Sequence, residues 1–204
     1  MLVSVRLIVL TFVLGLAASP APGAASELTP SAGFRFGGEV SPSAVQQRTI
    51  DESLAYGLTY DISLAPEKWI SVLWTHQSSE ADLPGLLPDD DTLDLTIDYL
   101  LVGTAYRPVL KKPTRPFVMV AVGMTRVDTR RSEFDSDLVA SGMIGGGAKF
   151  PISERLSFRL EGRGYLNFEE ATLSGTCGGA SCSLRFAADG ALQFEGLAGL
   201  TIAF

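Results

Sequence analysis

The chain has 204 residues, of which 46% are hydrophobic and 19% charged, and its formal net charge is −7. This length is enough for one domain with a sizeable core. The acidic balance excludes the basic surface on which nucleic-acid binding depends, so we expect no nucleic-acid partner.

The first 25 residues have the layout of a secretory signal peptide. Arg6 precedes an apolar run from Leu7 to Ala18, and the small-residue stretch SPAPGAAS follows. We predict cleavage after Ala25, which leaves residues 26–204 as the mature domain. The alternative is an N-terminal membrane anchor, for which the run is short. After residue 25 no apolar run has the length of a membrane-spanning helix, which excludes a helical membrane protein.

The mature sequence alternates with a period of two residues, as strands do, and no stretch has a convincing helical period. The stretch TLDLTIDYLLVGTAY and the stretch LSFRLEGRGYLNF are the longest examples. We predict eight strands, at residues 32–40, 52–62, 69–77, 92–106, 116–126, 137–150, 156–168 and 191–204.

The predicted strands are long and their connections alternate in length. Several strands reach ten residues or more, and a tilted strand that crosses a bilayer needs about 9–11. Short connections such as SLAPEK and PISER follow the even strands, and longer polar connections follow the odd strands. This arrangement predicts an all-β fold, an eight-stranded antiparallel transmembrane β-barrel of up-and-down topology with its long loops outside the cell.

A soluble barrel would alternate in the same way with its faces reversed, and three features favour the membrane. The apolar face is rich in glycine and alanine, the lysines lie in or beside the short turns, and aromatic residues lie near the strand ends. Aromatic girdles mark the two interfaces of membrane barrels. The expected girdle residues are Trp69, Tyr106, Phe117 and Phe204 on the short-turn side, and Trp74, Phe168 and Phe194 on the loop side.

The charged residues of the polar face are then expected to line the lumen. An eight-stranded barrel is only wide enough for its side chains to fill it, so we predict a network of paired charges and leave a narrow ion path as the alternative. The predicted lumen residues are Arg35, Glu39, Asp94, Asp98, Arg159, Glu161, Arg163 and Glu195.

The stretch GGGAKFPISERLSFRLEGRGYL and the final FEGLAGLTIAF resemble the small outer-membrane β-barrel proteins of the OmpA-like and OmpW-like type. The resemblance implies the outer membrane of a Gram-negative cell and a terminal assembly signal at Gly199, Ile202 and Phe204. Leu197 departs from this pattern, because a polar residue is usual there. The implied partners are outer-membrane lipids, lipopolysaccharide and the barrel assembly machinery. We expect a monomer, although the sequence leaves the oligomeric state open.

The stretch WTHQSSE contains the one histidine of the chain. Its His76, Ser78 and Glu80 resemble the His-x-Ser pair and acid of outer-membrane lipid A deacylases, and residues i and i+2 of a strand share a face. The competing interpretation is a rim histidine at the level of the lipid headgroups.

Two further clusters stand out. Asp89, Asp90 and Asp91 offer oxygen ligands for a divalent cation, but a solvated acidic loop is the simpler interpretation, and we expect no metal and no cofactor. Cys177 and Cys182 are predicted to form a disulfide, since an exported chain meets an oxidising compartment.

From the sequence we therefore expect an outer-membrane protein with a structural or surface role and no catalysis. The alternatives are a narrow pore or small-molecule passage of the OmpW-like kind, and a lipid A-modifying enzyme that uses His76 and Ser78.

Overall fold

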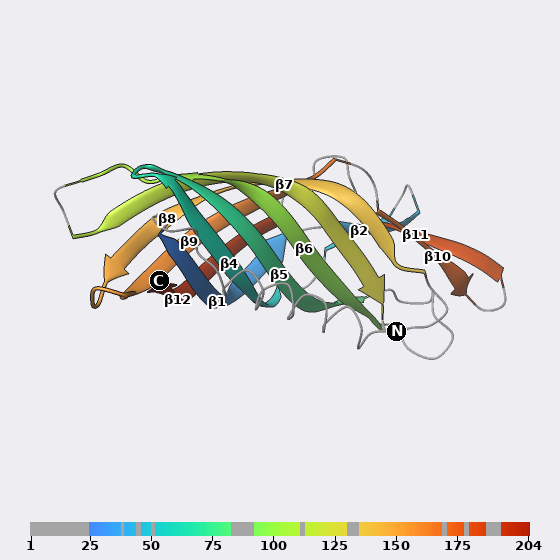
Figure 1. Cartoon of the computed structure of the whole chain (residues 1–204). Helices are drawn as coiled ribbons and strands as arrows, with labels where there is room; N and C mark the ends of the chain where they lie inside the picture. The colour runs from blue at the N-terminus through green and yellow to red at the C-terminus, as the bar shows by residue number, and fades with distance from the viewer. Residues whose placement is uncertain are drawn as a thin grey trace.

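The computed structural model describes residues 25–37, 39–43, 46–49, 52–82, 92–110, 113–129, 135–168, 171–177, 180–186 and 193–204. Eight strands form one closed antiparallel barrel, in the order β1-β12-β9-β8-β7-β6-β5-β4 (Figure 1). Their bounds are β1 Ser26–Gly37, β4 Ser53–Ala65, β5 Lys68–Asp82, β6 Thr92–Tyr106, β7 Arg115–Thr129, β8 Asp137–Pro151, β9 Leu156–Asn167 and β12 Gln193–Ala203. The predicted eight-stranded up-and-down barrel is confirmed. The predicted signal peptide lies almost wholly outside the described residues and stays a prediction.

The barrel closes where the first and last of its strands pair. The register joins Glu27 to Ala203 at one end of this seam and Phe36 to Phe194 near the other. The backbone N–H of Phe204 also donates a hydrogen bond of 2.9 Å to the carbonyl of Ser26. Because every barrel strand has two neighbours, the sheet has no free edge.

A second sheet lies beyond the end of the barrel opposite the C-terminus (Figure 1). It contains β2 Glu39–Ser43, β3 Gln46–Thr49, β10 Ala171–Cys177 and β11 Ala180–Phe186, in the order β10-β11-β2-β3. The sequence predicted loops for most of these residues. This was wrong, because two hairpins far apart in sequence complete each other's backbone hydrogen bonds through β2 and β11.

The outer wall of the barrel is apolar. Large hydrophobic residues such as Val122, Ile144 and Leu160 are 45–68% exposed there. Along β9 and the residue that follows it, the outward side chains run from Phe158 to Phe168, a height of about 25 Å for a tilted strand that matches the apolar band of outer-membrane barrels. In the part of the chain that the structure describes, no helix is long and apolar enough to cross a membrane.

Two of the expected girdle aromatics do not face outward. Phe117 is buried inside the barrel, and Trp69 packs against the same interior cluster. Their positions near strand ends predicted a place in the girdles, but the alternation along each strand decides which face they occupy.

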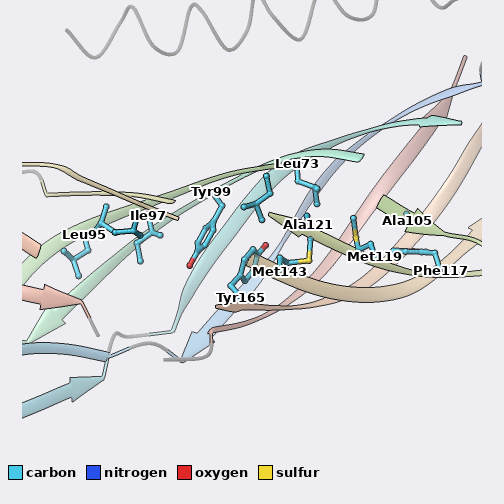
Figure 2. Packing of buried hydrophobic residues seen from close by; sticks show 13 residues of the cluster. Leu73, Leu95, Ile97, Tyr99, Ala105, Phe117, Met119, Ala121, Met143 and Tyr165 are labelled. Atoms are coloured by element: carbon cyan, nitrogen blue, oxygen red, sulfur yellow. The ribbon is translucent and has the colours of Figure 1, made fainter. Parts of the chain in front are cut away.

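The interior has an apolar half (Figure 2). Its walls are β5 to β8, whose inward side chains include Leu73, Ile97, Leu101, Met119 and Met143. Between residues 95 and 105 of β6 and between 117 and 127 of β7, the inward side chains carry no charge. The charged side chains therefore enter the lumen mainly from the other half of the barrel.

Candidate functional site

Nine charged side chains occupy the polar part of the lumen, among the described residues. The cationic ones outnumber the anionic ones by one. They are Glu27, Arg35, Asp61, Arg107, Lys149, Arg159, Glu161, Arg163 and Glu195.

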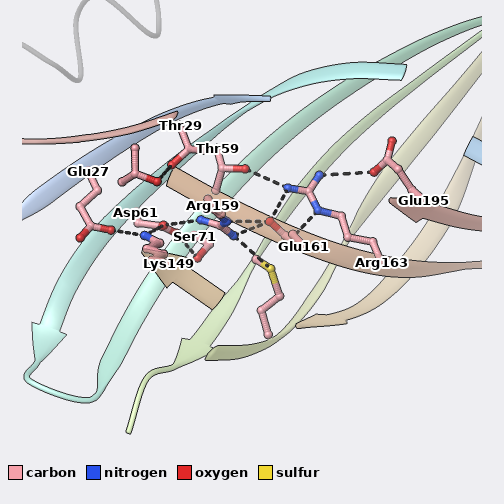
Figure 3. Close-up of polar contacts among 12 residues, drawn as sticks. Glu27, Thr29, Thr59, Asp61, Ser71, Lys149, Arg159, Glu161, Arg163 and Glu195 are labelled. Atoms are coloured by element: carbon pink, nitrogen blue, oxygen red, sulfur yellow. Dashed lines mark hydrogen bonds and ion pairs between the residues drawn. The ribbon is translucent and has the colours of Figure 1, made fainter. Parts of the chain in front are cut away.

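Asp61 of β4 is the centre of the cluster nearest the short turns (Figure 3). Its Oδ2 lies 3.4 Å from Lys149 Nζ and 3.1 Å from Arg159 Nη1, and it also pairs with Arg107. Ser71 donates to the other carboxylate oxygen at 2.5 Å. A fully buried carboxylate keeps its charge only with such compensation, so Asp61 holds three cations together.

Glu27 of β1 completes this cluster, which we call the floor cluster because it lies at the short-turn end of the barrel. It accepts a hydrogen bond from Arg107 Nη1 at 2.7 Å and another from Lys149. The guanidinium of Arg107 lies 4.0 Å from the centre of the Trp69 ring, which is a cation–π contact. Arg107 follows the last residue of β6, so this contact and its ion pairs fix the turn to the barrel floor.

Glu161 joins the floor cluster to the upper lumen along β9. Its carboxylate accepts from Arg159 Nε at 2.7 Å and from Arg163 Nε at 2.7 Å. Arg163 also donates to Thr59 of β4 at 3.1 Å. Every second residue of this part of β9 points inward, so Arg159, Glu161 and Arg163 form one continuous row of paired opposite charges.

The upper cluster contains Arg35 of β1 and Glu195 of β12, which pair at 2.7 Å with both side chains fully buried. The Arg35 guanidinium lies 4.8 Å from the Tyr99 ring centre and 4.9 Å from that of Tyr165. The Tyr165 hydroxyl donates to Glu195 at 2.5 Å. These contacts immobilise the arginine, so it is not a free charge available to a passing ion.

Among the described residues, two contacts cross the full width of the barrel. Lys149 of β8 reaches Asp61 of β4, and the Tyr99 hydroxyl of β6 donates to Gln193 of β12 at 2.9 Å. In the circular strand order each pair stands four strands apart, which is the diameter of an eight-stranded barrel. The lumen is bridged at two levels.

The structure places five of the predicted lumen residues in this network: Arg35, Arg159, Glu161, Arg163 and Glu195. Asp98 and Asp94 do not belong to it, because they alternate with Leu95, Ile97 and Tyr99, which are the inward residues of β6. Both faces of β6 carry apolar residues, so polarity alone did not distinguish the lumen face of this strand from its outer face.

Glu39 is also absent from the barrel wall. It lies in β2 of the second sheet, and its side chain lies outside the described residues. Four residues of the network were not predicted from the sequence: Glu27, Asp61, Arg107 and Lys149. Asp61 stands on the small-residue face of the alternating SLAYGLTYDI, which was the available signal. Lys149 was predicted to lie at the end of the strand 137–150, in or beside a short turn, whereas two residues follow it in β8 and its side chain is buried in the lumen.

A second arrangement of polar residues lies on the outer wall. His76 of β5 faces Asp98 of β6 directly in the strand register. The His76 Nδ1 atom lies 2.8 Å from Asp98 Oδ1, and its Nε2 atom lies 3.3 Å from the Ser78 hydroxyl. Serine, histidine and carboxylate therefore form one connected chain of hydrogen bonds. The sequence predicted the pair of Ser78 and His76. The acid that contacts His76 is Asp98, whereas Glu80 was expected.

Aromatic rings surround this histidine. The centre of the Tyr56 ring lies 4.9 Å from that of His76, and the Trp74 ring lies 6.2 Å from it. His76 is 8% exposed, whereas the neighbouring Ser78 is an exposed residue. The rings pack around the imidazole, while Ser78 is exposed.

The remaining predicted site residues lie where the structure gives no test of them. Asp89, Asp90 and Asp91, and the side chains of Glu80, Cys177 and Cys182, fall outside the described residues. No group of three or more possible metal ligands occurs among the residues that are described. The terminal Ile202 and Phe204 face outward and are 41% and 62% exposed, while the strand alternation places Gly199 on the inward side.

No protein-family model matches the sequence, and no curated protein matches it. Solved structures do match. Neisserial surface protein A has a TM-score of 0.58 at 11% identity over 89% of this chain and 99% of that one. The outer membrane protein OprG from Pseudomonas aeruginosa has a TM-score of 0.61 at 14% identity over 88% and 96%.

A major outer membrane protein from Thermus thermophilus has a TM-score of 0.56 at 14% identity, over 89% of this chain and 100% of that one. At these identities the likeness shows the fold alone. The chain has the fold of the small eight-stranded outer-membrane barrels, and the predicted fold class is confirmed.

Proposed function

We propose that this protein resides in the bacterial outer membrane as a closed, non-conducting barrel that carries its second sheet on the cell surface. Its surroundings are then outer-membrane lipids and lipopolysaccharide, and the barrel assembly machinery inserts it. A surface role follows, because the sheet β10-β11-β2-β3 lies beyond the end of the barrel opposite the C-terminus.

The observation that carries this proposal is the pair of contacts across the lumen. Lys149 meets Asp61 on the floor, and Tyr99 meets Gln193 higher up. An ion that entered would have to separate a buried ion pair, which costs several kcal/mol when one partner is left uncompensated. This disfavours the narrow pore that the sequence left open.

Single-channel recording in planar bilayers tests the proposal. We expect the wild-type protein to be silent. The double variant Asp61→Ser with Lys149→Ser removes the floor bridge without a change of net charge, and we expect a measurable increase in conductance over wild type.

The control is the double variant Arg126→Ser with Asp128→Ser, which removes an ion pair of 2.8 Å from the outer wall and leaves the lumen intact. It should be as silent as wild type. A wild-type protein that conducts steadily, with no change in the Asp61/Lys149 variant, would refute the proposal.

A further inference from the structure

We propose that Ser78, His76 and Asp98 form a hydrolytic site on the outer wall that cleaves acyl esters of lipids in the surrounding membrane leaflet. The inference goes beyond the closed barrel and does not depend on whether the lumen conducts. It departs from the expectation of a protein without catalysis, and it takes Asp98 as the acid where the alternative enzyme interpretation of the sequence had Glu80.

The hydrogen bonds have the direction that nucleophilic catalysis requires. With a proton on Nδ1, His76 donates to Asp98 at 2.8 Å and leaves Nε2 free to accept the Ser78 proton at 3.3 Å. A serine is activated by a base within hydrogen-bond reach when a third group orients that base. Ser78 is the nucleophile, His76 the base and Asp98 the positioning residue.

Asp98 is available for this role. The neighbouring cation in the register is Arg126 of β7, and its Nη2 pairs with Asp128 at 2.8 Å. The Asp98 side chain is 33% exposed and that of His76 is 11% exposed. The carboxylate therefore pairs with an imidazole that is largely shielded from solvent. The aromatic contacts of His76 keep the imidazole in the plane that serves both hydrogen bonds.

The triad stands at the level where lipid esters lie. On the outer wall of β5 to β7, the apolar row nearest the long loops is Trp74, Leu100 and Met124. The next row towards the loops is His76, Asp98 and Arg126. Two residues along a tilted strand rise by about 5 Å. The interfacial layer above the hydrocarbon is roughly 5–8 Å thick, so the triad lies within it.

Two neighbours suit this position. Trp74 and Tyr56 are aromatic side chains of the kind that settles at the membrane interface, and both contact His76. Thr96 stands directly opposite Ser78 in the register, and its hydroxyl is the donor we assign to the ester carbonyl oxygen. The bilayer itself presents the substrate, so the convex wall does not need a pocket.

The reaction balances with water as the second reactant. Ser78 Oγ forms a bond to the ester carbonyl carbon while its proton passes to His76 Nε2. The ester C–O bond breaks, and the leaving oxygen takes that proton to become an alcohol. Water then attacks the acyl-serine and gives a proton to Nε2, the fatty acid leaves, and the proton returns to Ser78.

A fluorophosphonate probe tests the nucleophile without knowledge of the lipid. Folded wild-type protein in detergent should gain one covalent adduct, and peptide mass spectrometry should place it on Ser78. Ser79→Ala is the matched control because Ser79 is the next residue in the strand and is buried on the opposite face. Ser79→Ala should label like wild type, and Ser78→Ala should not label. An adduct on another residue, or none, would overturn the proposal.

Lipid hydrolysis tests the substrate class in two arms. The protein is placed in vesicles of phosphatidylethanolamine and phosphatidylglycerol, or in vesicles that contain lipopolysaccharide, and released fatty acid is measured by mass spectrometry. Release in either arm that falls by at least about 10³-fold in Ser78→Ala and His76→Gln supports the site and identifies the lipid. No release in both arms contradicts it.

Asp98 needs a readout that a structural role would not change. We expect Asp98→Asn to lower kcat by about 10²–10⁴-fold with KM unchanged, and Asp98→Glu to restore part of kcat. Heat-modifiability gels verify that each variant is folded. A folded Asp98→Asn protein with wild-type kcat would exclude Asp98 from the mechanism. A silent channel combined with an unlabelled Ser78 would leave the closed barrel standing and remove the hydrolytic site.

Discussion

Replacement of Asp61 by asparagine tests whether the floor cluster of the lumen stabilises the barrel through charge. The two side chains have nearly the same size, and asparagine retains an oxygen that can accept the Ser71 hydrogen bond of 2.5 Å. The variant therefore removes one negative charge and little packing. It leaves Arg107, Lys149 and Arg159 around a neutral group.

The expected loss is large. The described lumen holds five cationic and four anionic side chains, so the substitution raises the excess positive charge from one to two. Removal of one partner from a buried ion pair costs about 3–5 kcal/mol. Glu27 and Glu161 remain as partners for the three cations, which places our expectation near the lower end, at about 3 kcal/mol.

The matched control is Asp128→Asn on the outer wall. Asp128 also pairs with an arginine at 2.8 Å, but its side chain is 28% exposed and that of Arg126 is 39% exposed. Pairs of this kind contribute about 0–1 kcal/mol. Urea unfolding in lipid vesicles, followed by tryptophan fluorescence and repeated from the folded and unfolded sides, gives both free energies. Equal losses in the two variants would refute the charge-based account of the lumen.

Three other predictions concern the wall and the end of the chain. A Cβ atom at Gly147 would lie 2.0 Å from the Leu160 carbonyl oxygen, whereas none at Gly162 would meet an atom within 4 Å. Gly147→Ala should therefore lower the urea midpoint, with a cost of about 1–3 kcal/mol, and Gly162→Ala should stay within about 0.5 kcal/mol of wild type. Val122→Arg on the lipid-facing wall should cost about 2–4 kcal/mol, and Leu64→Arg at the strand end about 0–1 kcal/mol, in the same unfolding assay. Phe204→Ala keeps the backbone bond to Ser26, so we expect normal stability once folded but less heat-modifiable protein in isolated outer membranes; wild-type yield would contradict the assembly signal.

The sequence predicted the lumen best where one face of a strand is uniformly apolar. On β9, Arg159, Glu161 and Arg163 alternate with outward leucine and glycine, so their inward direction could be read directly. Alternation was not enough on β6, where Leu95 and Ile97 face the apolar half of the lumen and Leu100 faces outward. When both faces of a strand are hydrophobic, the alternation of polar and apolar residues does not tell which face lines the lumen. Asp98 was therefore predicted in the lumen, although it lies on the outer wall.

The outer triad shows a second limit. His76 and Ser78 share a face by strand alternation, so their proximity follows from spacing alone. The pairing of His76 with Asp98 depends on the register between β5 and β6, and the long connection between these strands does not fix that register. The assembly of the second sheet was missed for the same reason, because the pairing of β2 with β11 joins two hairpins more than a hundred residues apart.

The distribution of charge in the lumen has a consequence for the order of folding. The apolar half is built from β5 to β8, which are consecutive in the chain and need only local hairpins to form. The charged half draws on the two ends of the barrel sequence, since Arg35 stands on β1 and its partner Glu195 on β12. These two charges meet only when the last strand joins the first. Closure of the barrel is therefore the step that gives Arg35 its carboxylate partner, because Glu195 already has Arg163 of β9 at 3.6 Å on its own side of the seam. An unclosed intermediate carries an arginine without a carboxylate at its β1 edge, where water or an assembly partner must solvate it.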